Sequence, residues 1–550
     1  MKKAVKHTWS ILEAGERKRF MLLAAADLFI SIADILSLAV LLYIIQFYVQ
    51  PETAGSAFFP DSLFDRNSSL PIIIFFILFS IKNAVAFLVT RAHYNFSADV
   101  ALRFSRNNLA SYQNENYSAF VNADASTQIR QIAFHPYEFA QFVLSGIQQV
   151  ITQSSLVLIA VIAILIFNAK LFLLLLLILL PPALFVFYYI RKKLGRIKNE
   201  VTYANEQSFR HLLDALKGWV ESNIYGRNEM FLTRFLHYRK RFGAALFNSI
   251  SWQSLPARFI EVFAVLGLFG LIIVARWYDE KNGDAFLTIG AFMAAAYKII
   301  PGMVRIINTS GQIKAFESSI TALRKFDEGI KITGTGENIQ SISFKNVSFS
   351  YNGMPVLHHL DLELKKGDFA GIRGLSGSGK TTVMNIMLGF LQPVSGTVFI
   401  NGKEAQYGLK KYWTRVAYVR QQSFFMHDTI LNNVTLCQDE YDQQRMEEAV
   451  TVSGIGTMFP DSRDGLQKMI TENGKNISGG QQQRIALARA LYKDADIILL
   501  DEPFNELDEK SEQEILRHMA VMAKRGKIIL MITHDTRSLA YCNKIISVES

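Results

Sequence analysis

Residues 369–390 read FAGIRGLSGSGKTTVMNIMLGF, and this stretch decides the fold of the second half of the chain. The apolar run FAGIR predicts a strand, the glycine-rich stretch from Gly374 predicts a turn, and the residues from Lys380 onward predict a helix. In that context the pattern G-x-x-x-x-G-K-[ST] is typical of a phosphate-binding loop, because backbone amides bared at a helix start attract anions. The predicted nucleotide-binding residues are Gly374, Leu375, Ser376, Gly377, Ser378, Gly379, Lys380, Thr381 and Thr382.

Lys380 is expected to reach the β- and γ-phosphate oxygens, and Thr381 to offer its hydroxyl to Mg²⁺. Further along, ADIILLDEP from Ala495 predicts a buried strand that ends in two carboxylates. Asp501 can hold Mg²⁺, and Glu502 can polarise an attacking water. A strand that ends at a solvated acidic turn is the alternative for this segment alone, but the phosphate loop upstream favours the catalytic interpretation.

Strands also precede the phosphate loop. FKNVSFSY from Phe344 alternates apolar and polar residues like a half-buried strand, and LHHLDLELKKGD from Leu357 continues the pattern. The second half is therefore predicted to be α/β.

The first half has apolar stretches of about 20 residues or more, which is the length that a helix needs to cross a bilayer. We predict six spans, at residues 21–49, 70–92, 143–167, 170–190, 253–276 and 284–306. The long segments after spans two and four predict membrane helices that continue into the cytosol as arms. HLLDALKGWVESNIYGR from His211 is either a docking helix for the soluble domain or a site of packing between the arms, and a weaker docking candidate lies between Ala125 and Tyr137.

The formal net charge of +10 reflects lysine and arginine in cytoplasmic segments rather than nucleic-acid binding. The basic segments are residues 1–20, 191–198 and 234–242, whereas the loops at 51–65 and 278–284 are acidic or neutral. The N-terminus and the soluble half are therefore predicted to be cytoplasmic, with no nucleic acid as a partner. We expect an integral protein of a bacterial inner membrane.

Together these motifs resemble the ATP-binding cassette family, and the spans before them are similar to its exporter-type half-transporters. ISGGQ at 477–481 is similar to the family signature, with isoleucine in the usual leucine place, and THD at 533–535 supplies the switch histidine, His534. VRQQSFFMHDTILNN from Val419 is similar to the glutamine loop. There Gln421 matches by spacing, although arginine replaces the preceding proline and Gln422 is the alternative. NELD at 505–508 departs from the usual SALD but keeps Asp508.

The resemblance implies catalytic roles for Glu502 and His534, with ATP and Mg²⁺ as cofactors. The Mg²⁺ ligands that it implies are Thr381, Gln421 and Asp501. Its other ATP-binding residues are Tyr351, which matches the aromatic residue that stacks on adenine, and Gln421, Ser478, Gly479, Gly480, Gln481 and Asp508. The fold class is thus a multidomain membrane protein. An all-α six-helix transmembrane domain (1–325) and a linker (326–341) precede an α/β P-loop ATPase cassette domain (342–550).

The resemblance further implies that the signature of one subunit serves the ATP held by its neighbour. A chain with every expected site residue favours a homodimer, and a heterodimer is the alternative. The expected function is ATP-driven export or flipping of a hydrophobic or amphipathic substrate, such as a lipid, lipid-linked saccharide, peptide or drug, by alternating access. The alternative is an ATP-gated channel or regulatory membrane protein with the same machinery.

Two basic residues bear on the substrate. Lys298 and Arg305, in AYKIIPGMVRI from Ala296, either snorkel to the cytoplasmic surface or face the central cavity. In the cavity they favour an anionic substrate such as a lipid phosphate. This stretch and the first outer loop bear some similarity to flippases of lipid-linked oligosaccharides.

Overall fold

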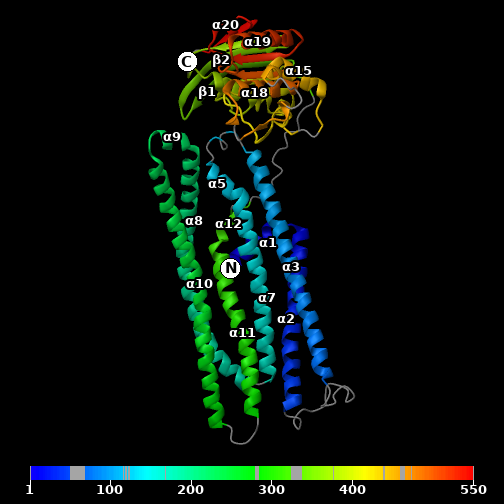
Figure 1. Cartoon of the computed structure of the whole chain (residues 1–550), viewed down its shortest axis with the longest axis vertical. Helices are drawn as coiled ribbons and strands as arrows, with labels where there is room; N and C mark the ends of the chain where they lie inside the picture. Colours follow the sequence, from blue (N-terminus) through cyan, green and yellow to red (C-terminus); the bar gives the residue numbers. More distant parts are fainter. Residues whose placement is uncertain are drawn as a thin grey trace. The chain divides into compact units, whose positions relative to one another are not determined.

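The structure is a computed structural model of a chain that divides into two compact units. It describes residues 2–49, 69–115, 117, 121, 124–167, 169–278, 284–321, 323, 337–375, 377–437, 440–458, 465–471 and 474–548. The first unit comprises Met1–Glu115 and Asn122–Asp327, and the second comprises Asn116–Val121 and Glu328–Ser550. Figure 1 shows long helices in the first unit and sheets covered by helices in the second. Most of the predicted linker over 326–341 lies outside the described residues.

The described part of the first unit is helical. Its helices are α1 (Lys2–Ile11), α2 (Ala14–Val49), α3 (Leu70–Gln113), α5 (Ala125–Ile129), α6 (His135–Glu138), α7 (Ser145–Phe167), α8 (Ala169–Lys217), α9 (Trp219–Ile224), α10 (Asn228–Tyr278), α11 (Asp284–Ala315) and α12 (Glu317–Thr321). Two π-helical segments, η2 (Arg130–Phe134) and η3 (Phe139–Leu144), flank α6. Five of the predicted spans fall within one of these helices, and the span 143–167 begins in η3 and continues through α7. Helices α3, α8 and α10 extend past the spans as the predicted arms.

Three described stretches are long and apolar enough to cross a membrane: Ala14–Ile45, Leu70–Gln113 and Ala125–Ile166. At most 17% of the residues in their most apolar windows are buried, which is the pattern of helices that face lipid or another subunit. The all-α character of the unit is confirmed, whereas the number of six crossings stays a prediction.

Acidic side chains of α2 face basic side chains of α3 in antiparallel order. The pairs are Glu16 with Arg103 (2.6 Å), Asp27 with His93 (2.9 Å) and Asp34 with Lys82. Thr152 of α7 also donates to the Asp27 carboxylate, at 2.5 Å. Since an unpaired charge in an apolar segment is costly, this pairing lets the helices carry ionisable residues.

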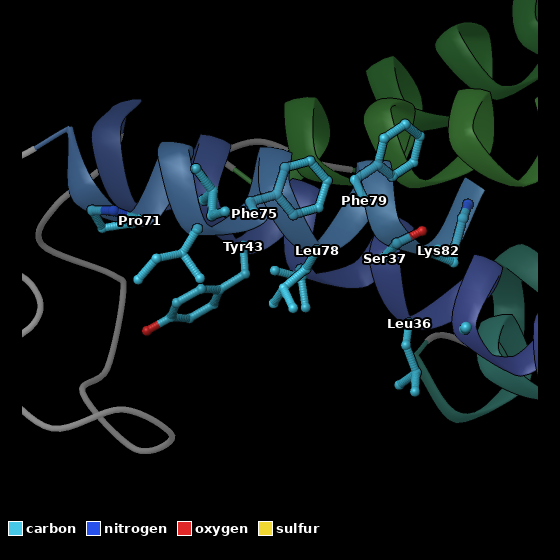
Figure 2. Close-up of a pocket in the computed structure, with 12 residues that line it drawn as sticks. Leu36, Ser37, Tyr43, Pro71, Phe75, Leu78, Phe79 and Lys82 are labelled. Carbon is cyan, nitrogen blue, oxygen red and sulfur yellow. The ribbon is translucent and has the colours of Figure 1, made fainter. Parts of the chain in front are cut away.

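A cavity of about 450 Å³ lies between α2 and α3, with Lys82 at one end. Figure 2 shows Leu36 and Tyr43 of α2 beside Phe75 and Phe79 of α3 along its wall. The lining is mostly apolar, so this surface is suited to contact with hydrocarbon.

The second unit contains three sheets. Their strands are β1 (Ser341–Tyr351), β2 (Met354–Lys365), β3 (Phe369–Arg373), β4 (Ser395–Ile400), β5 (Lys403–Glu404), β6 (Val416–Val419), β7 (Asp428–Thr429), β8 (Met469–Ile470), β9 (Ile497–Asp501), β10 (Ile528–Ile532) and β11 (Lys544–Ser547). The antiparallel sheet has the order β2-β1-β4-β5, the parallel sheet has the order β11-β3-β10-β9-β6, and β7 pairs with β8. The α/β class predicted for this half is confirmed.

Helices connect and cover the strands of this unit. They are α13 (Lys380–Leu388), α14 (Ile430–Thr435), α15 (Gln443–Ser453), α16 (Ile455–Met458), α18 (Gly479–Tyr492), α19 (Glu509–Lys524), α20 (Thr536–Leu539) and the 3₁₀ segment η4 (Gly408–Arg415). Every residue of β9 and β10 is buried, because apolar clusters cover both faces of the parallel sheet. In register, Ile532 of β10 pairs with Ile372 of β3 and with Asp501 of β9. The carboxyl ends of these strands therefore meet at one edge of the sheet.

The second unit also includes a short piece of the first predicted arm. Within residues 116–121, the ring of Tyr117 stacks on Phe390, with centroids 4.6 Å apart and planes at 11°. The predicted docking candidate between Ala125 and Tyr137 belongs instead to the first unit, where it forms α5, η2 and α6. The other candidate forms the end of α8 and the short helix α9, whose Trp219 and Ile224 are exposed.

Gly389 ends α13 in the left-handed region, with φ of +78°, and a Cβ there would lie 2.0 Å from the carbonyl oxygen of Tyr407. We expect Gly389→Ala to lower the midpoint of thermal unfolding by more than about 4 °C, because it adds a backbone clash to a left-handed cost of about 1–2 kcal/mol. Gly353→Ala is the matched control: φ is +85° there, with nothing within 4 Å of the added Cβ. Equal shifts for the two variants, measured by scanning fluorimetry of the full chain, would contradict the assignment of the clash.

Candidate functional site

The predicted phosphate loop lies between β3 and α13. Gly377 and Gly379 adopt φ of +85° and +91°, which opens the turn, and a Cβ on Gly379 would lie 2.8 Å from Val356. Lys380 begins α13 and is buried, and its Nζ donates to the carbonyl oxygens of Gly374 (3.0 Å) and Leu375 (2.8 Å). The Lys380 ammonium is thus held at the predicted phosphate loop. Ser376 lies outside the described residues.

A cavity of about 500 Å³ adjoins this loop and is lined by Gly374, Leu375, Ser378, His534 and their neighbours. The hydroxyl of Ser378 is buried there without a hydrogen-bond partner among the described residues. A buried polar atom that lacks a partner is costly unless a ligand or water satisfies it, so the cavity is suited to a polar group.

Glu502 is the centre of a hydrogen-bond cluster at the end of β9. Its Oε1 lies 3.0 Å from Nε2 of His534, and its Oε2 accepts from Nε2 of Gln421 (2.7 Å) and from Nδ2 of Asn505 (2.9 Å). The backbone of Glu502 is left-handed, with φ of +49°, which is a strained state for a residue with a side chain. The turn that follows β9 therefore directs this carboxylate toward His534 and Gln421.

Asp501, the neighbouring carboxylate, is buried at the last position of β9. Burial raises the pKa of Asp501, and the charge of Glu502 adds to that effect. The hydroxyls of Tyr418 (3.5 Å) and Thr381 lie within reach of the Asp501 carboxylate. A bound divalent cation would relieve this crowding of negative charge, and a carboxylate and a hydroxyl are oxygen donors of the kind that Mg²⁺ prefers. Asp501 and Thr381 are therefore suited to holding Mg²⁺.

Gln421, the third predicted Mg²⁺ ligand, donates its amide to Glu502 in this structure. Among the described residues, no group of three or more histidine, cysteine, aspartate or glutamate side chains could hold a metal ion. A site built from Asp501 and Thr381 leaves the remaining positions to water and to phosphate oxygens, as is usual for Mg²⁺.

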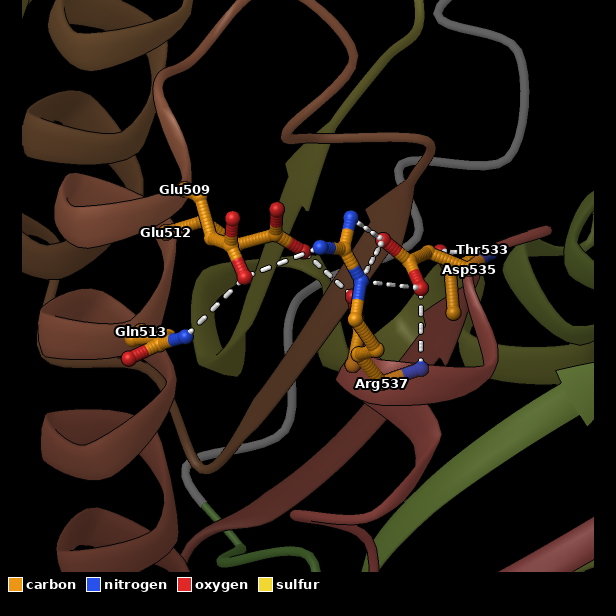
Figure 3. A network of polar contacts seen from close by, with 7 residues as sticks. Glu509, Glu512, Gln513, Thr533, Asp535 and Arg537 are labelled. Carbon is orange, nitrogen blue, oxygen red and sulfur yellow. Dashed lines mark hydrogen bonds and ion pairs between the residues drawn. The ribbon is translucent and has the colours of Figure 1, made fainter.

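A second polar network holds the turn that carries His534. Figure 3 shows Arg537 between the carboxylates of Asp535 (2.8 Å) and Glu509 (2.9 Å). The Asp535 side chain also accepts from the backbone of Arg537, so it caps α20, and its own backbone donates to Thr533 at 3.1 Å. The Arg537 guanidinium lowers the pKa of Asp535, so the carboxylate stays charged at neutral pH. This network ties the His534 turn to α19.

The signature residues form the N-terminus of α18. Ser478 accepts from the backbone N–H of Gln481 (3.3 Å), and the Gln481 side chain accepts from the backbone N–H of Ser478 (3.1 Å), which is a capping box. A Cβ on Gly480 would lie 2.8 Å from the carbonyl oxygen of Glu506. Only glycine therefore allows the turn to pack this closely on the loop before α19.

Asp508 caps α19 by accepting from the backbone of Ser511 (3.0 Å), and its carboxylate pairs with the buried Arg484 of α18 (3.2 Å). Hydrogen bonds from Ser511 lower the pKa of Asp508. Tyr351 lies exposed at the end of β1, against the edge of Phe349. The contacts described for the Glu502 carboxylate are with Gln421, Asn505 and His534, and neither Asp508 nor Tyr351 is among them.

The structure thus brings together the phosphate loop, Asp501, Glu502, Gln421 and His534. Two contributors were not assigned a role from the sequence: Asn505, which bonds to Glu502, and Tyr418, which faces Asp501. The departure of NELD from the usual pattern was the signal for Asn505, but sequence spacing does not reveal which atom its amide meets.

Two sequence models of known protein families match the chain. Residues 20–296, about half of the chain, match the sequence model of the "ABC transporter transmembrane region", and residues 357–505 match that of the "ABC transporter". The chain belongs to the ABC transporter family. Its second unit is the nucleotide-binding domain of that family, and its first unit is the membrane region.

Several curated ABC transporters are similar in sequence. A "probable ABC transporter ATP-binding/permease protein" of Haemophilus influenzae is 28% identical over 62% of this chain and 62% of its own length. An "ATP-dependent lipid A-core flippase" is 28% identical in Burkholderia orbicola, over 79% of this chain and 74% of the relative, and 28% identical in Escherichia coli K12, over 66% and 62%. The aligned chain thus spans about three fifths of the length of the Haemophilus and Escherichia relatives.

A solved ABC transporter shares the fold. The structure of "a bacterial Atm1-family ABC exporter with ATP bound" superposes with a TM-score of 0.80 over 98% of this chain and 94% of that one, at 19% sequence identity. The exporter architecture predicted from the sequence is therefore confirmed at the level of the fold.

Proposed function

We propose that this chain hydrolyses ATP and uses the free energy to export or flip a hydrophobic or amphipathic substrate across the membrane. The observation that carries the proposal is the contact between Glu502 and His534 (3.0 Å) at the edge of the sheet that also presents Lys380. The names of the relatives, an ATP-binding/permease protein and ATP-dependent flippases, support ATP as the energy source.

In the proposed reaction, a water oxygen attacks the γ-phosphorus of ATP, its proton moves to the Glu502 carboxylate, and the bond to the ADP oxygen breaks. His534 holds the carboxylate oxygen in place, and Lys380 releases the loop carbonyls to bind phosphate oxygens. Asp501 and Thr381 would hold Mg²⁺, which would supply positive charge beside the phosphate oxygens. The Glu502 side chain is only 15% exposed, so bulk water has little access to the proposed base.

Glu502→Gln should retain ATP binding but lower turnover by about 100-fold or more, because the amide cannot accept the proton from water. Turnover is measured as phosphate release by the purified chain, and binding with a fluorescent ATP analogue. A variant that binds and hydrolyses at the wild-type rate would remove Glu502 from the role of base.

We further propose a dimer in which each ATP lies between the phosphate loop of one subunit and the signature turn of the other. Within one chain, Gly479 and Gly480 pack against the loop at Glu506, whereas the Nζ of Lys380 donates to carbonyl oxygens of the phosphate loop. The capping box uses the amides of Ser478 and Gln481, so the amides of Gly479 and Gly480 are the ones proposed to meet a phosphate from outside the subunit. An ATP whose phosphates contact both subunits holds them together, and hydrolysis of that ATP weakens the interface. A homodimer is favoured because the chain carries every predicted site residue.

Complementation tests this arrangement. Lys380→Ala removes the phosphate contact and Gly480→Ala distorts the signature turn, so neither variant alone should hydrolyse ATP. In a mixed dimer, the intact loop of one subunit meets the intact signature of the other, and turnover should return. Mixtures of differently tagged, co-purified variants that stay inactive would show that each signature serves its own chain, while purification of the chain only with an unlike partner would rule out the homodimer.

The arms supply a route from ATP to the membrane helices. Trp219, Ile224 and Tyr225 around α9 expose apolar side chains, which favours docking of this helix over packing between the arms. The stacking of Tyr117 on Phe390 supports a second docking point in the segment 116–121. Movement of the cassettes would then tilt the membrane helices as rigid bodies.

The substrate proposed is an amphipathic lipid with an anionic group, by analogy with the lipid A-core flippases. Arg305 is exposed near the end of α11, whereas the side chain of Lys298 lies outside the described residues. An exposed cation in this apolar helix favours a negatively charged partner.

Neutralising both cations, Lys298→Gln with Arg305→Gln, should weaken the stimulation of ATP turnover by an anionic lipid and leave basal turnover unchanged. Vesicles of a zwitterionic lipid are the control, because there the variant and the wild type should match. Equal stimulation of both proteins by the anionic lipid would contradict the proposed role.

In the same vesicles, ATP-driven transfer of lipid between leaflets supports a transporter, and passive ion conductance would indicate an ATP-gated channel instead.

A further inference from the structure

We propose that Asn505 is a positioning residue that holds Glu502 in a resting arrangement and thereby limits the basal rate of ATP hydrolysis. The proposal rests on the proposed function, since it concerns the same base. It assigns a role to the first residue of NELD, where the family pattern has serine.

The contacts of the Glu502 carboxylate carry the proposal. Oε2 accepts two amide N–H groups, from Gln421 (2.7 Å) and Asn505 (2.9 Å), and Oε1 contacts His534 (3.0 Å). A carboxylate oxygen has two lone pairs, so the two amides occupy Oε2. A general base needs a free lone pair directed at the water that it activates. In this arrangement the amides compete with that water.

The two amides differ in what can release them. Gln421 is predicted to be an Mg²⁺ ligand, so a bound ion would draw its side chain away from Glu502. Asn505 has no competing ligand of that kind, and its amide would remain on Oε2. A serine at this position could not replace it, because the hydroxyl sits directly on Cβ, one bond nearer the backbone than the Asn505 amide nitrogen.

The backbone that presents Asn505 is fixed by its neighbours. The N–H of Glu506 donates to the side chain of Gln483 on α18 (3.0 Å), and the N–H of Leu507 donates to the carbonyl of Phe504 (3.0 Å). The pair of Asp508 with Arg484 (3.2 Å) anchors the end of the same loop. Asn505 is thus held by a loop attached to the helix that begins at the signature turn, so the amide cannot drift from Glu502 without a rotation of its side chain or a shift of that loop.

The test compares Asn505→Ser and Asn505→Leu with the wild-type full chain in lipid nanodiscs. Both variants remove the amide donor, and leucine keeps nearly the size of asparagine. We expect kcat for ATP to rise by about threefold to tenfold in both, the scale of one hydrogen bond, while KM stays within twofold.

Gln443→Leu is the matched control, because its amide also donates to a carboxylate, that of Glu447 (3.1 Å), on the surface of α15. It should leave kcat and KM unchanged. If Asn505→Ser and Asn505→Leu both match the wild type, or lower kcat, the holding role is wrong. A rise in Asn505→Ser alone would also overturn it, since leucine removes the same donor.

Failure of the proposed function gives a different result. If the wild type hydrolyses ATP and Glu502→Gln does not, the base is established, and the Asn505 variants alone decide this proposal. If Glu502→Gln hydrolyses ATP at the wild-type rate, then Glu502 is not the base, and both proposals fall together.

Discussion

The parallel register of β3, β10, β9 and β6 is the constraint on which the candidate site depends. Ile532 pairs with Ile372 on one side and with Asp501 on the other, and Val419 pairs with Leu500. Because parallel strands end at the same edge of a sheet, the residues that follow each of them are brought together. The phosphate loop, the glutamine segment, the carboxylate pair and His534 are far apart in sequence, yet each lies at the end of one of these strands or just after it.

This register explains how two adjacent carboxylates acquire different surroundings. Asp501 is the last residue of β9, so its side chain is buried beside Tyr418, and burial raises its pKa. Glu502 leaves the strand with a left-handed backbone, while its N–H still donates to the carbonyl of Ile532 at 3.1 Å. The strain of that conformation, about 1–2 kcal/mol, is offset by the contacts that it allows with Gln421, Asn505 and His534. One carboxylate is thereby suited to a cation and the other to a water.

Local patterns predicted the parts of the fold that depend on local chemistry. The glycine-rich turn, the strand ending at Asp501 and the helix beginning at Lys380 were confirmed, because periodicity and turn residues act over a few positions. The partners of individual side chains were not predictable in this way. The amide of Asn505 on Glu502 and the carboxylate of Asp27 beside His93 depend on the path of the chain between them and on rotamers, which spacing does not determine. Site residues named from motifs therefore remain predictions about role even where the structure brings them together.

The membrane unit is held together by different interactions from those of the sheet domain. In the described part of this unit, each long helix makes its backbone hydrogen bonds internally, so side-chain contacts fix how one helix lies against another. Between α2 and α3, the acid–base pairs extend from Glu16 with Arg103 to Asp34 with Lys82, and Asp27 adds a bond to Thr152 of α7. Sliding α3 along α2 would separate every pair at once and leave charges unpaired in apolar surroundings, at a cost of several kcal/mol. The pairs therefore hold α2 and α3 in one register along their length.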